Sequence, residues 1–124
     1  MKAEIAVELG KYLSEYNLED VVVLDLTECN SWTDYFVIGT LASAPQWKGI
    51  YRHIKDFAAG HNLEMRLGKG KTQDEDIWHL VDLGEIVVHI FTAEGRKFYE
   101  LDKLWFKAKE LFSSKEDEST PELI

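Results

Sequence analysis

The chain of 124 residues contains a single cysteine, Cys29. Without a second cysteine it can form no internal disulfide and no zinc cluster built from several cysteines. A lone cysteine is more often a small buried side chain than a catalytic thiol. This composition suits a reducing compartment, and we expect the protein to be cytoplasmic.

Long apolar runs and positive charge are also scarce. No run approaches the length of roughly 20 residues that spans a membrane, and Glu4 and Glu8 interrupt the segment where a signal peptide needs an apolar core. The 14 Lys and Arg residues face 23 Asp and Glu residues, a formal net charge of −9. That balance argues against a general nucleic-acid binder and against docking on anionic lipid. A basic protein is the natural macromolecular partner.

The common signatures of enzymes are missing or incomplete. The sequence has no nucleophile elbow, the motif that would present the serine of a Ser/His/Asp triad. The segment "GKGKTQ" (68–73) lacks the first glycine of a phosphate-binding loop. His79 and His89 lie on neighbouring predicted strands and could approach each other. They lack a third metal ligand, so hydrogen-bonded strand histidines are the better interpretation. Asp74 and Asp76 could hold magnesium for phosphoryl transfer, but in so polar a loop solvated acids are favoured.

The residues that are abundant predict one folded domain. Apolar residues make up 45% of the chain and aromatic residues 12%, enough for one core, and no internal repeat is visible. Periodicity predicts the order α-β-β-α-β-β-β-α, which indicates an α/β (α+β) single domain with a mixed sheet of about five strands and flanking helices. The predicted elements are a helix near 5–16, strands at 21–27 and 34–42, a helix at 47–58, a strand at 63–68, an antiparallel hairpin of 77–83 and 85–91 around Gly84, and a last helix carrying Leu101, Leu104, Trp105, Ala108, Leu111 and Phe112. The domain is expected to occupy 1–112, and the acidic segment 113–124 is expected to be disordered.

The second strand of the hairpin lacks clean polar alternation. One set of its residues, Val87, His89 and Phe91, should point to one face of the sheet. The residues between them are Ile86, Val88 and Ile90 and should point to the other. Either the chain itself covers both faces, or helices cover one face and a partner covers part of the other.

Several large aromatic residues lie among charges. Trp78 opens a strand beside the polar loop, where full burial is difficult, and Tyr99 is expected near the start of the last helix, beside Arg96 and Lys97. Large aromatics ringed by charge are typical of a protein-binding patch. Trp105 falls on the apolar stripe of the predicted helix, where core packing is an equal alternative.

These residues carry a resemblance to a known family. Five matching segments run through residues 3 to 109 in the same order and spacing: Asp34-Tyr35-Phe36-Val37-Ile38; Trp78 with Leu80, Asp82 and Gly84; Val87-Val88-His89 with Phe91; Arg96 with Phe98-Tyr99 and Leu101; and Leu104-Trp105. Together they resemble the ribosomal silencing factor family, also called Iojap-like.

The resemblance implies a nucleotidyltransferase-like fold without catalytic residues, and hence no enzyme activity, cofactor or metal. It implies binding to ribosomal protein L-fourteen of the large subunit, which sterically blocks association of the ribosomal subunits and represses translation under nutrient limitation. No direct specific nucleic-acid binding and no membrane are expected. The implied contact surface comprises Trp78, Asp82, Gly84, His89, Phe91, Arg96, Tyr99 and Leu101, with Trp105 as support from behind.

The chain departs from the family pattern at two places. The segment "TLASAPQWKG" keeps Gln46 but not the arginine that usually precedes it, and Lys71 and Thr72 replace a Glu-Gly pair.

Two alternative functions stay open. The first alternative is a small magnesium-dependent, nucleotidyltransferase-like enzyme using Asp74 and Asp76. The second is a dimerisation module, and for the free protein both a monomer and a homodimer stay open.

Overall fold

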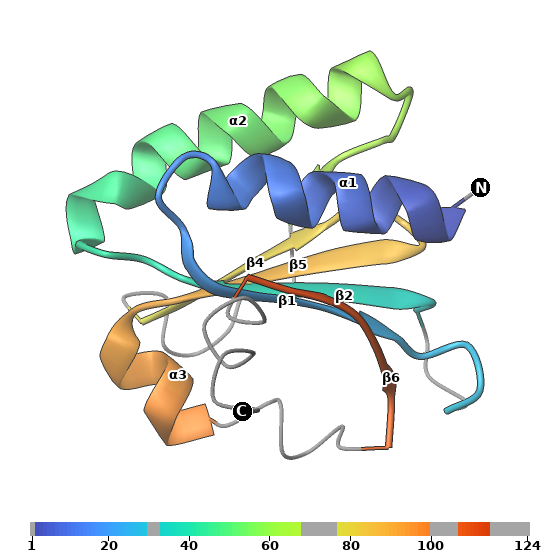
Figure 1. The fold of residues 1–124 in the computed structure, drawn as a ribbon. Helices are drawn as coiled ribbons and strands as arrows, with labels where there is room; N and C mark the ends of the chain where they lie inside the picture. The colour runs from blue at the N-terminus through green and yellow to red at the C-terminus, as the bar shows by residue number, and fades with distance from the viewer. Residues whose placement is uncertain (1, 30–32, 68–76, 100–106, 115–124) are drawn as a thin grey trace, which may run out of the picture.

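The computed structural model describes residues 2–29, 33–67, 77–99 and 107–114. Figure 1 shows the elements in chain order. They are α1 (Lys2–Ser14), β1 (Glu19–Asp25), β2 (Tyr35–Thr40), the 3-10 turn η1 (Ala44–Gln46), α2 (Trp47–Gly60), β3 (Arg66–Leu67), β4 (Trp78–Asp82), β5 (Ile86–Phe91), α3 (Ala93–Tyr99) and β6 (Lys109–Ser113).

The strands form one mixed sheet in the order β3-β4-β5-β2-β1-β6. The central strands β2 and β5 run parallel, and every other neighbouring pair is antiparallel. The predicted hairpin is confirmed, with Trp78 opposite Phe91 and Asp82 opposite Val87. The prediction of a mixed sheet with flanking helices is therefore confirmed, and the described sheet has six strands rather than about five.

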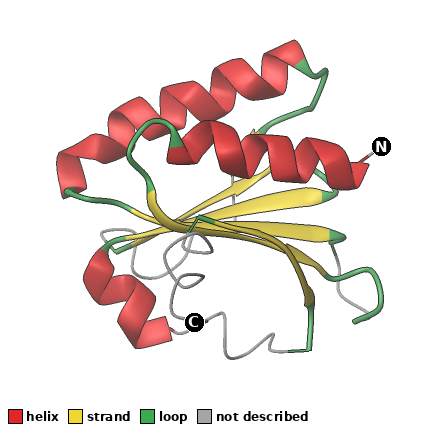
Figure 2. Ribbon diagram, viewed as in Figure 1, coloured by secondary structure: helices red, strands yellow, loops and turns green. Residues whose placement is uncertain are grey.

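Helices lie on both sides of this sheet. Both α1 and α2 lie across one face, and the short α3 lies on the other side, below the sheet in the views of Figures 1 and 2. The apolar stripe of α1 buries Leu9 and Leu13, and that of α2 buries Ile50 and Ile54, all at most 1% exposed. Burial of these two stripes is what fixes both helices against the sheet.

The two central strands are buried on both faces. Every residue of β2 and β5 is buried. The residues Ile86, Val88 and Ile90 belong to the cluster beneath α1 and α2. Val87 and Phe91 belong to a second cluster on the opposite face. Of the two alternatives from the sequence, burial of both faces is the one observed for these strands.

The end of the chain corrects the predicted last helix. Residues 109–113 form β6, which pairs antiparallel with the outer edge of β1. The spacing of Ala108, Leu111 and Phe112 imitates one face of a helix, so local periodicity could not detect a strand whose partner lies about 90 residues earlier. The remaining positions of that prediction, Leu101, Leu104 and Trp105, lie outside the described residues.

A bulge explains the misleading pattern. The register shifts between Val23 and Leu24, which pair with Phe112 and Glu110 and leave Leu111 between them. In a regular strand adjacent residues point to opposite faces, whereas an extra residue locally breaks that alternation. Accordingly, both Leu111 and Phe112 pack against the cluster beneath α1 and α2.

The predicted domain boundary at residue 112 is also too early. Ser113 is the last residue of β6, opposite Val22. The backbone N–H of Ser114 donates to the carbonyl of Val21 at 2.8 Å, and the Ser114 hydroxyl accepts from the Val21 N–H at 2.9 Å. The folded domain therefore includes Ser114, and the acidic residues 115–124 lie outside the described residues. Among the described helices, none is long and apolar enough to cross a membrane.

Candidate partner-binding surface

The β4–β5 turn is shaped by Asp82 and Gly84. Gly84 has a φ of +96°, a backbone conformation that favours glycine. The Asp82 carboxylate accepts a hydrogen bond from the Gly84 N–H at 2.8 Å, and the Leu83 N–H donates to the Ile86 carbonyl at 2.8 Å. Asp82 and Gly84, both predicted contact residues, therefore stabilise the turn that closes the hairpin.

Trp78 and His89 meet on the face of the sheet opposite α1 and α2. The indole Nε1–H of Trp78 donates to Nδ1 of His89 at 3.2 Å. Because that nitrogen accepts, the proton of a neutral imidazole resides on Nε2. The Trp78 ring also lies 5.2 Å from the Phe91 ring and 4.5 Å from the Tyr99 ring, measured between centroids. These contacts hold a half-buried indole in one orientation.

His89 itself lies below the surface. The side chain is 3% exposed, and its Nε2 has no hydrogen-bond partner among the described residues. The Phe36 ring lies 4.3 Å from it, nearly perpendicular. Burial in these apolar surroundings lowers the pKa of His89 to about 3. His89 is therefore neutral at physiological pH.

The second histidine of the hairpin is not its neighbour. His79 pairs with Ile90, whereas His89 pairs with Leu80, so the two imidazoles point to opposite faces of the sheet. On its own face His79 stacks on Trp47 of α2, with ring centroids 4.1 Å apart and 9° between the planes. The expectation that the two histidines could approach each other is wrong, because they occupy adjacent rather than matching register positions.

One cap and two contacts with other elements hold α3 in place. Thr92 precedes the helix, and its hydroxyl accepts from the Gly95 N–H at 3.0 Å, as an N-terminal cap does. Arg96 donates from Nη1 to the Thr40 hydroxyl at 2.8 Å. A Cβ added at Gly95 would overlap the carbonyl oxygen of Ile77, so only glycine allows the helix to approach the start of β4 this closely.

The last two described residues of α3 point in different directions. Tyr99 is half-buried and packs on Trp78 and, with centroids 6.0 Å apart, on Phe91. Phe98 is 72% exposed, and its ring meets the Tyr99 ring nearly at right angles at 4.9 Å. Tyr99 was expected near the start of the last helix, but it lies at the end of α3.

The structure thus sorts the predicted contact residues into layers. Trp78, Arg96 and Tyr99 are partly exposed. Trp78 and Tyr99 pack together, while Arg96 lies one turn earlier on α3 and reaches Thr40 of β2. His89 and Phe91, at 3% and 0% exposure, can only support that surface from beneath. Trp78 packs on Tyr99, and Tyr99 packs on Phe98. We call this group of three side chains the aromatic edge. Its most exposed member was missed by the sequence analysis, because two adjacent aromatics give no sign of which one faces solvent.

Asp82 and Gly84 belong to another part of the molecule. They close the turn at the far end of the hairpin from the Trp78–Phe91 pair. Four residue steps along β4 separate Trp78 from Asp82, and antiparallel strands rise about 3.4 Å per residue. A partner must therefore span more than 10 Å to touch both. Leu101 lies outside the described residues.

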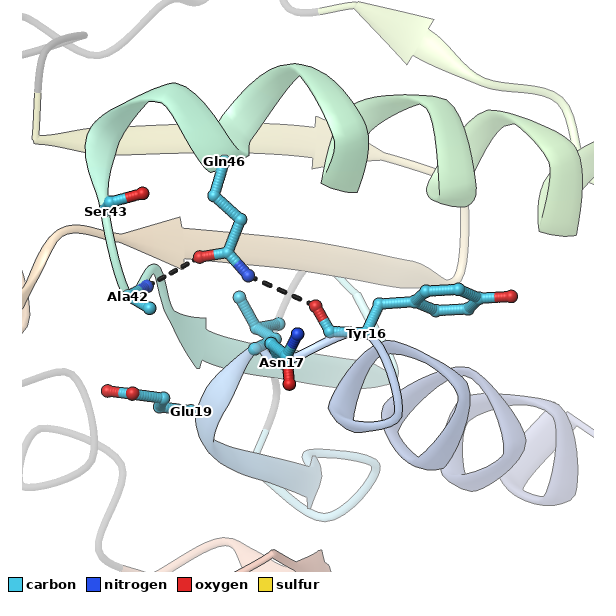
Figure 3. A pocket seen from close by; sticks show the side chains of 7 residues that line it. Tyr16, Asn17, Glu19, Ala42, Ser43 and Gln46 are labelled. Atoms are coloured by element: carbon cyan, nitrogen blue, oxygen red, sulfur yellow. Dashed lines mark hydrogen bonds between the residues drawn. The ribbon is translucent and has the colours of Figure 1, made fainter.

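A cavity of about 530 Å³ lies between the turn after α1 and the segment after β2 (Figure 3). Gln46 crosses it: its Oε1 accepts from the Ala42 N–H at 2.6 Å, and its Nε2 donates to the Tyr16 carbonyl at 3.2 Å. The amide therefore ties two loops together. Of the residues that line the cavity, Glu19 alone carries a carboxylate and none is a histidine or cysteine. The ionisable side chains of this lining are those of Tyr16 and Glu19.

The described residues also offer no candidate metal site. Within the described ranges, no group of three or more His, Cys, Asp or Glu side chains is placed to hold a metal ion. Asp74 and Asp76, the two acids considered as magnesium ligands, lie outside those ranges.

Comparison with known proteins decides the family. The family model described as "Ribosomal silencing factor during starvation" matches residues 2–123. The chain belongs to the ribosomal silencing factor family. Residues 2–123 include the hairpin and α3, so the aromatic edge is part of the family domain.

Individual relatives agree with this assignment. The chain is 40% identical over 87 residues to the ribosomal silencing factor of Bacillus subtilis, covering 70% of this chain and 72% of that protein. It is 32% identical over 104 residues to a mouse protein named "Mitochondrial assembly of ribosomal large subunit protein 1", covering 78% of this chain and 43% of that one. A crystal structure of a Chromobacterium violaceum protein superposes with a TM-score of 0.71 at 23% identity, over 83% of this chain and 84% of that one, which shows the shared fold.

Proposed function

We propose that this protein silences ribosomes by binding the large subunit through ribosomal protein L-fourteen and sterically blocking association with the small subunit. Repression of translation under nutrient limitation is the consequence, and its site of action is the cytoplasm. Membership of the silencing-factor family supports this proposal. The mouse relative is itself named for assembly of the ribosomal large subunit.

The observation that carries the proposal is the aromatic edge. Protein interfaces draw their energy from a few large side chains, chiefly Trp, Tyr and Arg, that pack at the centre of the contact. Here Trp78 and Tyr99 are partly exposed, and Arg96 lies one helical turn before Tyr99. All three are held by packing or hydrogen bonds, so little conformational freedom is lost when a partner binds.

Charge supports a basic protein as the partner. The formal net charge of −9 gives an attractive field for a basic surface and a repulsive one for exposed RNA. Screening by salt should slow association with a basic protein. The charge thus fits a ribosomal protein better than the ribosomal RNA around it.

Subunit joining in a purified system tests the proposal. Small and large subunits are mixed at a magnesium concentration that joins them, after the large subunits have been incubated with increasing amounts of the protein. The joined fraction should fall as the large subunits become occupied. Full joining on occupied large subunits would contradict the blocking mechanism. Magnesium-dependent nucleotide transfer that disappears in the Asp74→Asn/Asp76→Asn double variant would favour the enzyme instead.

A further inference from the structure

Phe98 stands out among the hydrophobic residues of the described chain. Two large hydrophobic side chains are exposed there, Tyr16 at 41% and Phe98 at 72%. A single exposed phenylalanine is ordinary on a protein surface and carries no conclusion. Its surroundings are what distinguish Phe98.

Phe98 is the outer member of a packed aromatic group. Its ring contacts Tyr99 edge-on at 4.9 Å, Tyr99 contacts Trp78 at 4.5 Å, and Trp78 is hydrogen-bonded to the buried His89. Successive residues of a helix point about 100° apart. With Tyr99 turned towards the sheet, Phe98 is turned outwards, where a partner can enclose it.

The helix that presents Phe98 is fixed in place. Thr92 caps its first turn, and Arg96 is bonded to Thr40. Gly95 brings it against Ile77, a contact that any larger side chain would prevent. An anchor on such a support loses little freedom on binding, because its backbone is already ordered. Exposed Glu94 and Lys97 on the same helix provide charged neighbours of the kind that surround an interface centre.

From these contacts we propose that Phe98 is the principal hydrophobic anchor of the protein, and that it enters an apolar pocket on the bound ribosomal protein. This inference rests on the proposed function. Tyr99 and Trp78 form the base that holds the anchor, and Gly95 is a positioning residue that sets its height above the sheet. The formal net charge of −9 favours a basic protein over RNA as the occupant of this surface.

The test measures binding of full-length variants to isolated ribosomal protein L-fourteen and to purified large subunits. Phe98→Ala should raise the Kd about thirtyfold in both titrations while leaving the thermal melt unchanged, since the ring is mostly in water. One control should bind within about threefold of the parent. It is Tyr16→Ala, which removes the other exposed aromatic, from the turn after α1.

Each outcome separates this inference from the function on which it rests. If the parent binds and Phe98→Ala binds equally tightly, the anchor is wrong and the proposed function stands. If the parent binds neither the isolated protein nor the subunits, both are wrong. Binding to large-subunit RNA stripped of protein that weakens in Phe98→Ala would overturn the assignment of a protein pocket. Binding to subunits alone, lost in Phe98→Ala, would keep the anchor and overturn L-fourteen as the partner.

Discussion

Acidification from pH 7 to pH 4.5 should lower the free energy of unfolding by about 2–3 kcal/mol through His89 alone. The pKa of His89 is about 3 in the folded protein, against about 6.5 in an unfolded chain. Between these values the unfolded state binds a proton that the folded state excludes. The contribution of His89 to the free energy of unfolding is therefore complete above about pH 6.5 and is lost as the pH drops towards 3.

Urea denaturation across this pH range, compared with His89→Phe, checks the prediction. Phenylalanine fits the aromatic surroundings of Phe36 and Phe91 and does not titrate. Other ionisable groups contribute similarly to both proteins, so the difference between the two curves isolates His89. Parallel curves from pH 7 to pH 4.5 would show that His89 is hydrated or able to move, in conflict with its burial.

Tyr99→Ala should weaken binding to ribosomal protein L-fourteen by about 2 kcal/mol, or about thirtyfold. The change removes the ring on which Phe98 rests and exposes one side of Trp78. Because Tyr99 is half-buried rather than fully exposed, it should also cost about 1–2 kcal/mol of stability. Binding must therefore be titrated well below the melting temperature of the variant.

A control variant that loses a similar amount of stability separates the effect on binding from the effect on stability. Tyr51 is also half-buried and packs on Trp47, but it belongs to α2 on the other face of the sheet. Tyr51→Ala should lose comparable stability and keep the binding of the parent. If Tyr99→Ala binds as tightly as the parent, or if both variants lose binding equally, Tyr99 is not part of the contact.

The sequence predicted those helices and strands that are determined by their own local residue pattern. Periodicity located α1 and α2, and Gly84 between two β-branched runs located the β4–β5 hairpin. Periodicity failed for β6, because pairing with β1 and a bulge at Leu111 override the helical spacing of its residues. Pairing between distant segments has no local signal, and this is why the last element was assigned to the wrong class.

The sequence names candidate contact residues, but it does not show which of them reach the surface. The motif pattern includes Phe98-Tyr99, yet it gives neither the register that buries His89 and Phe91 nor the direction in which α3 turns Phe98. The role of Gly95 depends on the Ile77 carbonyl, a contact between two elements. Packing decides which of these side chains are buried and which face solvent, since exposure depends on residues far away in the chain.

Sedimentation of cell extract on a sucrose gradient, with the protein followed across the fractions, tests the silencing mechanism most directly. If the protein blocks subunit association, it should travel with free large subunits and be nearly absent from joined ribosomes and polysomes. Equal occupancy of joined ribosomes and free large subunits would contradict the mechanism, because a bound protein that permits joining cannot be blocking it.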